Sequence, residues 1–572
     1  MKTIRKCHQD TLSSFGLEEL KQEVDRMRFN LKSNHQIIGS LRIPVFKAHG
    51  CTPEYAENAL WAYLSRDSYE GDLRDTMVSL VPPSLTNPRI SHRAGFSLPE
   101  RVQGSMVSLS SIPYGINQRV ATLLRARIDN TRLWEEIDRI GDSPYWMEIF
   151  ADWRGRLYTD SRGILSYQGD DLSRALTQFN EAKPVDTDDL KIFLEIIEDE
   201  YDLTHARIQE ICADPEAYLD DNDDSKPCCV LAAALAYEEA ETTGHSRYVL
   251  QQDATCSGFQ HIAMFLRDSY LGKLVNILSS TKKRDLYKKV VRLLVKTRTQ
   301  AWVETLAKQC PKKLRKQMAK PTVILTGYGS GAKPLALEFA GFIQKGRDHI
   351  SYDEVKAMIM EGEVVGIAPL SCLKEIMEGK SQMEILKTCL EIAEEMQEVL
   401  FEIAPSIKKF IKALRGRAVS VYVKSGGKET FGWQSPNGME VDLLGYRVSR
   451  DHEINEVCTT IDGVRKRINI LSMVEDDCAS QAPPCFVHTW DAHVIHEVAL
   501  EAESLGIAVA MIHDSIGTHV CHARWARNAY TRHMVEAHRD THLNNLLTSR
   551  GGKEITMGDL DIEACLEAQM VY

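Results

Sequence analysis

Two acidic residues, far apart in the chain and each at the end of a strand-like run, most constrain how this sequence of 572 residues folds. Asp253 follows the run Arg247–Gln252, and Asp514 follows the apolar run Ile507–Ile512 and opens a predicted turn. A carboxylate at a strand end is fixed by its sheet and is open at the sheet edge. We therefore expect a fold that brings both carboxylates to one edge, within reach of shared cations.

A positively charged segment lies between the two carboxylates and ends at Tyr328-Gly329. From Lys282 to Lys320 it has fourteen lysines and arginines against two acidic residues, although the whole chain carries a net charge of −12. Lys316 and Lys320 lie about one turn apart on a helix and so share a face. A charge run alone is usually a solvated surface, but one leading into Tyr328 favours a phosphate-lined channel.

This order of groups suits metal-dependent nucleotidyl transfer. Two Mg2+ ions need acidic anchors, lysines neutralise a triphosphate, and the carbonyl of Ala254 offers another hard oxygen ligand. Each group also has a structural alternative: Asp253 as a helix cap, Asp514 as a turn cap, the lysines as a surface pair. Tyr328 either stacks on a base or fills a groove. The ordered set favours catalysis over these separate interpretations.

Composition sets the broad class of the protein. The length exceeds what one hydrophobic core supports, so we expect two to four subdomains. No apolar run approaches the roughly 18 residues of a membrane helix, and Met1–His8 has no apolar signal core, which predicts a cytoplasmic protein. Fourteen cysteines without a regular framework predict reduced thiols.

One group of residues has the side chains of a zinc site, but its spacing fits an amphipathic helix better than a tetrahedral centre. The residues of this group are Cys521, His522, His533, His538 and His542.

The predicted fold class is α+β and predominantly helical. Helical periodicity covers residues 1–145, 259–320, 333–415 and 491–505. Residues 418–472 instead alternate as strands do, with the runs Val419–Val423 and Lys466–Leu471 around the turn Pro436-Asn437-Gly438. Carboxylates at strand ends in such a fold argue against a doubly wound sheet.

The motifs, taken in order, resemble the single-subunit DNA-directed RNA polymerases of T-odd bacteriophages and mitochondria. The resemblance spans about residues 150–572. The segment Asp253-x-x-Cys-Ser-Gly258-x-Gln-His261 resembles motif A of the family. Motif B resembles Lys316-x3-Lys320-x7-Tyr328-Gly329, with lysine where the family commonly has arginine first. The other matching segments are Asp152-Trp-Arg-Gly-Arg156, Val275–Leu278, Asp285-Leu-Tyr287, Phe486-Val-His488-x-x-Asp491 and His513-Asp514-Ser515.

The resemblance implies a right-hand polymerase fold with thumb, palm and fingers. Carried onto this chain, it places a reduced N-terminal region and the thumb at residues 1–145 and the first part of the palm at 146–275. The fingers, with a short specificity-loop region, take residues 276–485, and the second part of the palm takes 486–572.

The resemblance also assigns the groups around the reacting phosphates. Asp253, Asp514 and the carbonyl of Ala254 would bind two Mg2+ ions. Lys320 would hold the incoming triphosphate, with Lys316 helping.

The sugar and the nucleic acid have their own implied contacts. Tyr328 and His488 would read the ribose 2′-hydroxyl, and Gly258 and Tyr287 would lie on the substrate side. The implied nucleic-acid contacts are Arg154 and Arg156.

The implied reaction is DNA-templated RNA synthesis from ribonucleoside triphosphates. Related Pol-I-type DNA polymerases place a bulky Glu at the position of Gly258, and they usually read His-Asp-Glu where this chain has His513-Asp514-Ser515. The runner-up is a DNA polymerase or a primase-like enzyme on the same fold. A nucleic-acid-binding relic would have lost Asp253, Asp514 or Lys320, all of which are present, and a metal-dependent nuclease does not need the lysine helix.

Two departures from the family bear on promoter recognition. Only about 150 residues precede the Arg154 element, and the segment between Ile468 and Phe486 is short where phage relatives carry a long promoter-reading hairpin. We therefore expect an accessory promoter-recognition or single-stranded-DNA-binding protein as a partner, and no membrane. A phage-encoded chain would act in the host bacterial cytoplasm.

Overall fold

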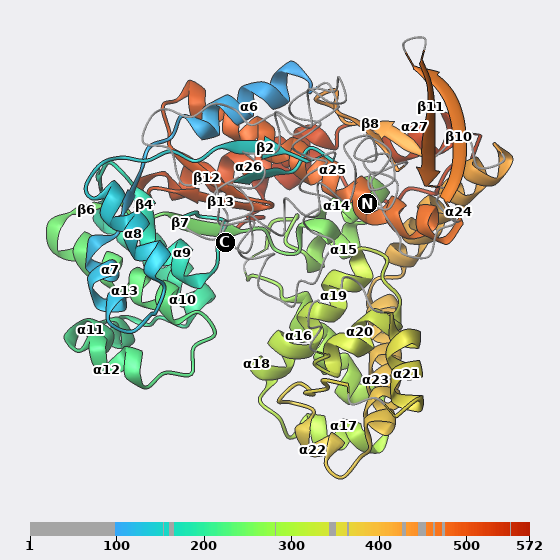
Figure 1. Cartoon of the computed structure of the whole chain (residues 1–572), viewed down its shortest axis with the longest axis horizontal. Helices are drawn as coiled ribbons and strands as arrows, with labels where there is room; N and C mark the ends of the chain where they lie inside the picture. Colours follow the sequence, from blue (N-terminus) through green and yellow to red (C-terminus); the bar gives the residue numbers. More distant parts are fainter. Residues whose placement is uncertain are drawn as a thin grey trace, which may run out of the picture.

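The computed structural model is predominantly helical, and every sheet in its described part is small and antiparallel (Figure 1). This confirms the predominantly helical α+β prediction. The structure describes residues 98–152, 154–159, 165–280, 282–342, 351–362, 365–425, 431–443, 454–461, 464–471, 475–540, 542–549 and 551–572. For residues 132, 442 and those described between 454 and 479 it describes the backbone alone. The helical prediction for residues 1–97 lies outside the described residues.

A three-stranded sheet joins two distant parts of the chain. Its strands are β7 (Leu250–Asp253), β12 (Val509–Ile512) and β13 (Ser515–Thr518), in the order β12-β13-β7. Both strand-like runs predicted next to the carboxylates are therefore confirmed. The final residues extend this sheet, because the backbones of Asp253 and Tyr572 exchange two hydrogen bonds of 3.1 Å.

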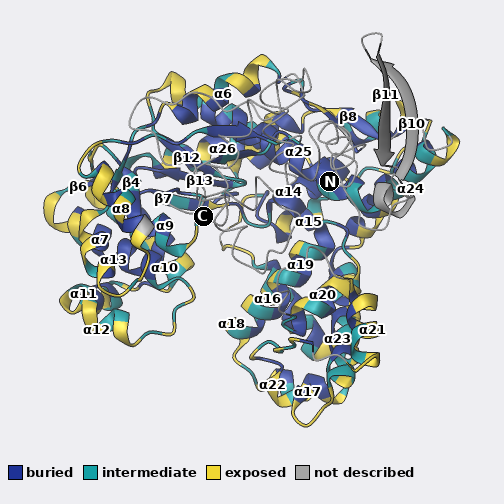
Figure 2. Cartoon of the chain, viewed as in Figure 1, coloured by how far each residue is buried: buried dark blue, intermediate teal, exposed yellow. Residues whose placement is uncertain are grey.

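Long helices pack around this sheet and form the upper part of the molecule in Figure 1. The helices α6 (Glu100–Ser110) and α26 (Ala523–Ala537) pack along α25 (Glu475–Ser504). The helix α14 (Ser257–Leu266) also contacts α25, and all ten of its residues are buried. The dark blue interior in Figure 2 follows these elements. Nearby are β2 (Ile149–Ala151), β3 (Leu157–Thr159), α15 (Ser269–Leu274), η3 (Val520–His522), α27 (His542–Ser549) and η4 (Glu563–Glu567).

A first helical lobe surrounds α13 (Pro227–Thr243), which is apolar and buried on all sides from Cys228 to Tyr237. The carboxylate of Asp171 caps this helix by accepting the backbone N–H groups of Cys228 and Cys229, at 2.8 and 3.0 Å. The lobe lies on the left in Figure 1. Its helices are α7 (Gln118–Arg125), α8 (Thr131–Ile140), α9 (Asp171–Leu176), α10 (Thr187–Tyr201), α11 (His205–Ala213) and α12 (Pro215–Asp220). Short strands β1 (Tyr114–Ile116), β4 (Thr177–Phe179), β5 (Lys183–Pro184) and β6 (His245–Ser246) border it.

A second helical lobe, green to yellow at the lower right of Figure 1, is built on α23 (Gln382–Ile403). This helix starts in a capping box between Ser381 and Glu384 and buries an apolar stripe at helical spacing. The other helices are α16 (Leu286–Thr297), α17 (Ala301–Ala307), α18 (Pro311–Leu314), η2 (Arg315–Ala319), α19 (Lys320–Gly327), α20 (Ala332–Phe339), α21 (Tyr352–Met360) and α22 (Lys374–Met377).

One strand prediction is wrong, because Val419–Val423 belongs to helix α24 (Pro405–Lys424). In a strand, Val419, Val421 and Val423 would share a face, but here Val421 is buried and Val423 is 56% exposed. Leu414, Ala418 and Val421 instead form a buried helical stripe, and α24 packs along α25. Tertiary packing has overridden the local β propensity of this run.

Two antiparallel hairpins follow α24. The first pairs β8 (Gly432–Gln434) with β9 (Glu440–Asp442) around the predicted turn, where Gly438 has φ +86°. The second pairs β10 (Ile454–Ile461) with β11 (Val464–Leu471) over eight residue pairs. These strands overlap the segment 468–486 only at the end of β11, and α25 begins within that segment. That the specificity-loop region is short stays a prediction.

None of the helices in the described ranges has both the length and the apolar character to cross a bilayer.

Candidate active site

The register of the central sheet brings the two predicted carboxylates together. Asp253, the last residue of β7, pairs directly with Ser515, the first residue of β13. Asp514 immediately precedes Ser515 and lies in the two-residue turn that joins β12 to β13. Directly opposed residues on antiparallel strands have Cα atoms roughly 4.5–5.5 Å apart. The two acids are thus neighbours at one edge of the sheet.

The turn that carries Asp514 has an uncommon backbone. His513 adopts φ +57°, a left-handed conformation that few residues other than glycine adopt readily. Two-residue hairpin loops require such a conformation, so the strand pairing on both sides holds His513 there. The turn thereby fixes Asp514 beside the end of β7.

Electrostatics at this edge disfavour a bare carboxylate. Burial, together with the negative charges of Asp491 and Asp253, raises the pKa of Asp514 to about 7, although Ser257 and Arg156 oppose the shift. An acid raised in this way by its acidic neighbours regains its charge when a cation binds beside it.

The oxygen atoms at the sheet edge fit a hard divalent cation. Asp253 and Asp514 form no ion pair with any cationic side chain that the structure describes. Ala254 faces Val571 in a bridge whose hydrogen bonds come from residues 253 and 255, so its own carbonyl points away from the C-terminal segment. Within the described ranges no group of three or more His, Cys, Asp and Glu side chains converges as a metal site. Mg2+ commonly takes one or two carboxylates and completes its shell with water and substrate phosphates.

The two predicted lysines lie on a helix with an altered turn. Residues Arg315–Ala319 form a π-turn closed by the Lys320 N–H to the Arg315 carbonyl, and α19 begins at Lys320. Pro321 thus stands in the first turn of α19, where its missing N–H is tolerated. Lys316 and Lys320 are both exposed, and neither has an ion pair among the described side chains.

The rest of the positive run is less uniform. Several of its cations are paired with acids of other elements, as in Lys283 with Asp199 and Arg298 with Glu395. Part of the run is therefore a solvated surface whose positive charges are paired with acids. The other part, near α19, includes the lysines that form no ion pair among the described side chains.

Tyr328 follows α19 and faces Gly258 on α14. A side chain at Gly258 would lie 3.3 Å from Cε1 and 3.7 Å from the hydroxyl of Tyr328. At the adjacent residues, a side chain at Gly327 would overlap the Phe259 ring at 2.2 Å. The two glycines let α14 and α19 approach closely, so the space at Gly258 holds the tyrosine ring. Whether the ribose also uses this space stays a prediction.

His488 on α25 closes the same corner. Its ring meets the Tyr328 ring edge-on at 4.7 Å, and its Nδ1 lies 3.0 Å from Nη1 of Arg154. Burial and the charges of Arg156 and Arg154 hold the pKa of His488 well below its usual value. His488 is therefore a neutral imidazole at physiological pH.

Arg154 and Arg156 lie in the turn between β2 and β3, and both are engaged within the protein. Asp152 accepts two hydrogen bonds from the Arg154 guanidinium and one from the backbone of each arginine. The Arg156 guanidinium donates to Asp491 on α25 at 2.7 Å, with its side chain 12% exposed. In this structure the arginines organise the corner, and their contact with nucleic acid stays a prediction.

Asp491 ends the motif Phe486-Val-His488-x-x-Asp491, but the sequence predicted no role for it. Asp491 is 1% exposed and receives Arg156. Burial would raise its pKa, but His261 and Arg156 outweigh burial and hold it well below the usual range. No local pattern marks a partner 335 positions away, so only the fold could reveal this pair.

Tyr287 stands at the start of α16, beside Cys256 and Arg315. The Arg315 guanidinium lies over its ring, 5.2 Å from the centroid, and also donates to Asp285 at 2.6 Å. Burial raises the pKa of Cys256 to about 12, and the charges acting on this thiol include Lys320 and Asp514. The lysine helix and the carboxylate edge therefore both lie within electrostatic range of Cys256.

The residues considered for zinc serve other contacts. The predicted amphipathic helix is confirmed for α26, with Tyr530, Met534 and Val535 buried, but of the five candidate zinc residues only His533 lies within it. Cys521 and His522 lie in η3, His538 follows α26, and His542 begins α27. His533 lies 2.7 Å from Glu501 and 3.0 Å from Glu536, whereas His538 faces His261.

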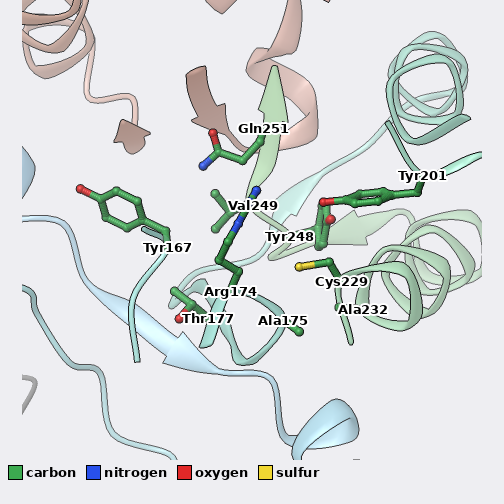
Figure 3. Close-up of a pocket in the computed structure, with 10 residues that line it drawn as sticks. All are labelled: Tyr167, Arg174, Ala175, Thr177, Tyr201, Cys229, Ala232, Tyr248, Val249 and Gln251. Carbon is green, nitrogen blue, oxygen red and sulfur yellow. The ribbon is translucent and has the colours of Figure 1, made fainter. Parts of the chain in front are cut away.

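A small cavity lies behind the carboxylate strand (Figure 3). Arg174 points into it between the first helical lobe and Gln251 of β7, and Tyr201 and Tyr248 line its far side. Gln251 accepts a hydrogen bond of 2.8 Å from Ser515, the neighbour of Asp514. The cavity lies behind the sheet and is distinct from the carboxylate edge.

Comparison with known sequences identifies the family. The sequence model described as DNA-dependent RNA polymerase matches residues 198–556, well over half of the chain. The chain belongs to this family. The match includes both carboxylates, the lysine helix and His488, which confirms the resemblance on which the site was predicted.

Individual RNA polymerases show how distant the similarity is. DNA-directed RNA polymerase 1, mitochondrial, of Arabidopsis thaliana is 23% identical over 463 residues, covering 74% of this chain and 43% of that protein. The mitochondrial DNA-directed RNA polymerase of Schizosaccharomyces pombe is 26% identical, covering 65% and 32%. The DNA-directed RNA polymerase of Enterobacteria phage K11 is 24% identical, covering 69% and 47%. The chain thus spans less than half the length of these relatives.

Proposed function

We propose that this chain synthesises RNA on a DNA template from ribonucleoside triphosphates. The observation that carries the proposal is the pairing of Asp253 with Ser515, which sets Asp514 beside it at an open sheet edge. Family membership and the two free lysines before Tyr328 support the same reaction.

The chain supplies distinct groups for the transfer step. Asp253, Asp514 and the Ala254 carbonyl would hold two Mg2+ ions, which when bound stabilise the attacking 3′-oxygen and the leaving pyrophosphate oxygen. Lys320 binds the triphosphate and neutralises the charge that develops on the leaving group, and Lys316 adds to the local positive field. The new bond joins the 3′-oxygen to the α-phosphorus as the bond to pyrophosphate breaks.

Sugar selection follows from the protonation of His488. Arginine only donates hydrogen bonds, so Nδ1 of His488 accepts from Arg154, and the neutral ring carries its proton on Nε2. That N–H and the Tyr328 hydroxyl form a polar corner that recognises a 2′-hydroxyl. A deoxyribose would lack the hydroxyl that pairs with the Nε2–H of the buried His488, which penalises its binding.

The arrangement of the lobes fits a right hand. We propose that residues 146–275 and 486–572 form the palm, that residues 276–485 form the fingers, and that the thumb lies within 1–145. The palm assignment rests on the sheet that joins β7 to β12 and β13.

Nucleotide incorporation tests this function directly. The full chain is given a primed single-stranded DNA template, Mg2+ and either labelled ribonucleotides or labelled deoxyribonucleotides. Template-directed extension with ribonucleotides is expected. Preferential deoxyribonucleotide extension would support a DNA polymerase, and dinucleotides made without a primer would support a primase-like enzyme.

Promoter recognition remains a separate question. We infer that an accessory protein contributes to promoter recognition. The length of the β10–β11 hairpin, however, favours direct recognition of the promoter by this chain. Strands of eight residues extend about 27 Å, which exceeds the roughly 12 Å width of a DNA major groove. Run-off transcription on closed duplex DNA decides between an accessory protein and direct recognition. The full chain is compared with a variant whose hairpin is shortened in both strands, at the paired residues Cys458 and Arg467. Sequence-specific initiation by the full chain alone, lost on shortening, would remove the accessory requirement.

A further inference from the structure

A chain of buried polar side chains leads from the sugar-selecting corner into the protein interior. Arg156 donates to Asp491 at 2.7 Å, and the other oxygen of Asp491 lies 3.7 Å from Nε2 of His261. Nδ1 of His261 lies 3.1 Å from Nε2 of His538, whose Nδ1 lies 2.9 Å from the Met534 carbonyl. Four side chains from four different segments thus follow one another in series. The facing atoms of His261 and Asp491 are buried and form no hydrogen bond at 3.7 Å.

The fixed end of this chain determines where the protons are. A backbone carbonyl only accepts hydrogen bonds, so Nδ1 of His538 carries a proton and donates to Met534. Burial, followed by the neighbouring His261, holds the pKa of His538 well below its usual value, so this ring is neutral. Its Nε2 therefore accepts, and the hydrogen bond between the rings places a proton on Nδ1 of His261.

The other nitrogen of His261 faces an anion. His261 is 0% exposed and Asp491 is 1% exposed, so no bulk solvent separates them. With Nδ1 already protonated, a neutral His261 would direct its Nε2 lone pair toward the Asp491 carboxylate. In a dry interior such a contact is repulsive, whereas a proton on Nε2 turns it into an attraction between opposite charges.

The charged surroundings of His261 are few. The acid that faces the ring comes from α25, and His538 comes from the end of α26. On its own helix His261 stacks on Phe265 at 6.1 Å, which carries no charge. Arg267 and His542 act on His538 beyond it, and Arg156 lies across Asp491.

We propose that His261 is a buried imidazolium that positions Asp491, and through Asp491 the Arg156 guanidinium, for selection of the ribose. His261 touches no substrate atom in this scheme and is a positioning residue. The inference deepens the proposed ribonucleotide polymerisation and names the device that holds its sugar corner in place. Without the second cation, Asp491 has a single donor and Arg156 can shift away from Tyr328 and His488.

Nuclear magnetic resonance of the ring nitrogens tests the protonation without any catalysis. The full chain is labelled with ¹⁵N-histidine and measured at pH 8 without substrate, and the signals that are lost in H261Q identify His261. We expect both nitrogens of His261 to be protonated in the wild type and the ring to become neutral in D491N. A neutral His261 in the wild type would overturn the proposal.

Sugar discrimination tests the positioning role. In H261Q we expect the preference for ribonucleotides over deoxyribonucleotides to fall about tenfold, equivalent to about 1.4 kcal/mol. The double variant H261Q/D491N should discriminate no worse than D491N alone, because both residues act as one unit. H519Q is the matched control, since it removes a buried histidine that stacks on Phe179 at 4.2 Å, outside this series.

The outcomes are separable. Equal loss of discrimination in H519Q, or additive effects in the double variant, would reduce His261 to a structural role and contradict the proposal. A wild-type chain that incorporates no nucleotide would defeat the proposed function, and the protonation measurement would still decide the state of His261.

Discussion

The two sides of the candidate active site differ in whether their charged side chains form ion pairs within the protein. At the sheet edge, Asp253 and Asp514 have no ion pair among the described residues, and Lys316 and Lys320 are likewise free. In the sugar corner, by contrast, every arginine charge is paired.

The paired corner is built from acids and bases of the chain itself. Arg154 is held by Asp152, and Arg156 is held by Asp491. A partly buried unpaired carboxylate such as Asp514 is costly, and a fold keeps it where a ligand supplies the missing partner. Asp253, Lys316 and Lys320 are exposed and carry no such cost. This difference between the two sides fits the proposal that the free groups bind metal and triphosphate, whereas the paired groups hold the shape that recognises the sugar.

Removing a free carboxylate should have the largest effect. In D514N we expect nucleotide incorporation to fall more than about 1,000-fold, because the neutral amide no longer anchors a cation. Single-turnover extension measures the loss, and fluorescence anisotropy should show unchanged binding of the template. D138N, which removes an exposed carboxylate paired with Arg125, serves as the control and should retain activity. Substantial activity in D514N would break the distinction between free and paired groups.

Removing a free lysine should have the next largest effect. K320A is expected to lower kcat/KM for ribonucleotides about 100-fold, since one cation is lost from the charge that builds on the leaving phosphates. K316A should cost less, because Lys316 is assigned a helping role. Steady-state kinetics with varied nucleotide concentration measures both. K308A, an exposed lysine in the same positive run, should match the wild type. A similar loss in K308A would point to the general field of the run.

The paired corner predicts a change of specificity with little loss of rate. In Y328F the discrimination against deoxyribonucleotides should fall about tenfold, because one hydrogen-bonding partner of the 2′-hydroxyl is gone. Competition between ribonucleotides and deoxyribonucleotides on one template measures the ratio. An unchanged ratio, with activity retained, would remove Tyr328 from sugar selection.

The smallest expected effect concerns stability without metal. The folded pKa of Asp514, about 7, lies above that of an ordinary aspartate, so the folded protein loses stability as pH rises from about 4 to 7. D514N cannot ionise and should melt at a higher temperature than the wild type at pH 8. The difference should shrink as the pH falls below 7. Thermal melts in a chelator at several pH values, repeated with Mg2+, measure it; a lower melting temperature for D514N at pH 8 would contradict the raised pKa.

Much of the carboxylate edge could be predicted because its signals are local. The apolar run before Asp514 has the length and composition of a buried strand, and the run before Asp253 has the length of a strand and alternates in burial. The turn between β8 and β9 was predicted by Pro436-Asn437-Gly438 for the same reason. In each case neighbouring residues decide the backbone conformation.

The features that could not be predicted depend on long-range packing. The alternation of Val419–Val423 is typical of a strand, but burial against α25 makes the run helical. The close approach of α14 and α19 requires both Gly258 and Gly327, which are far apart in the sequence. The pairing of Arg156 with Asp491, and of His261 with His538, likewise exists only in the folded chain.

The pairing of the last residues with Asp253 bears on how the protein is made. Thr255 donates to the Met570 carbonyl at 3.0 Å, and Tyr572 exchanges two hydrogen bonds with Asp253. When the ribosome has synthesised Asp253 and Asp514, it has therefore not yet synthesised residues 570–572, which pair with the backbone beside Asp253. A nascent chain acquires this border only after residue 570 has left the exit tunnel, so a product truncated before that point would carry both acids with one flank of β7 uncovered.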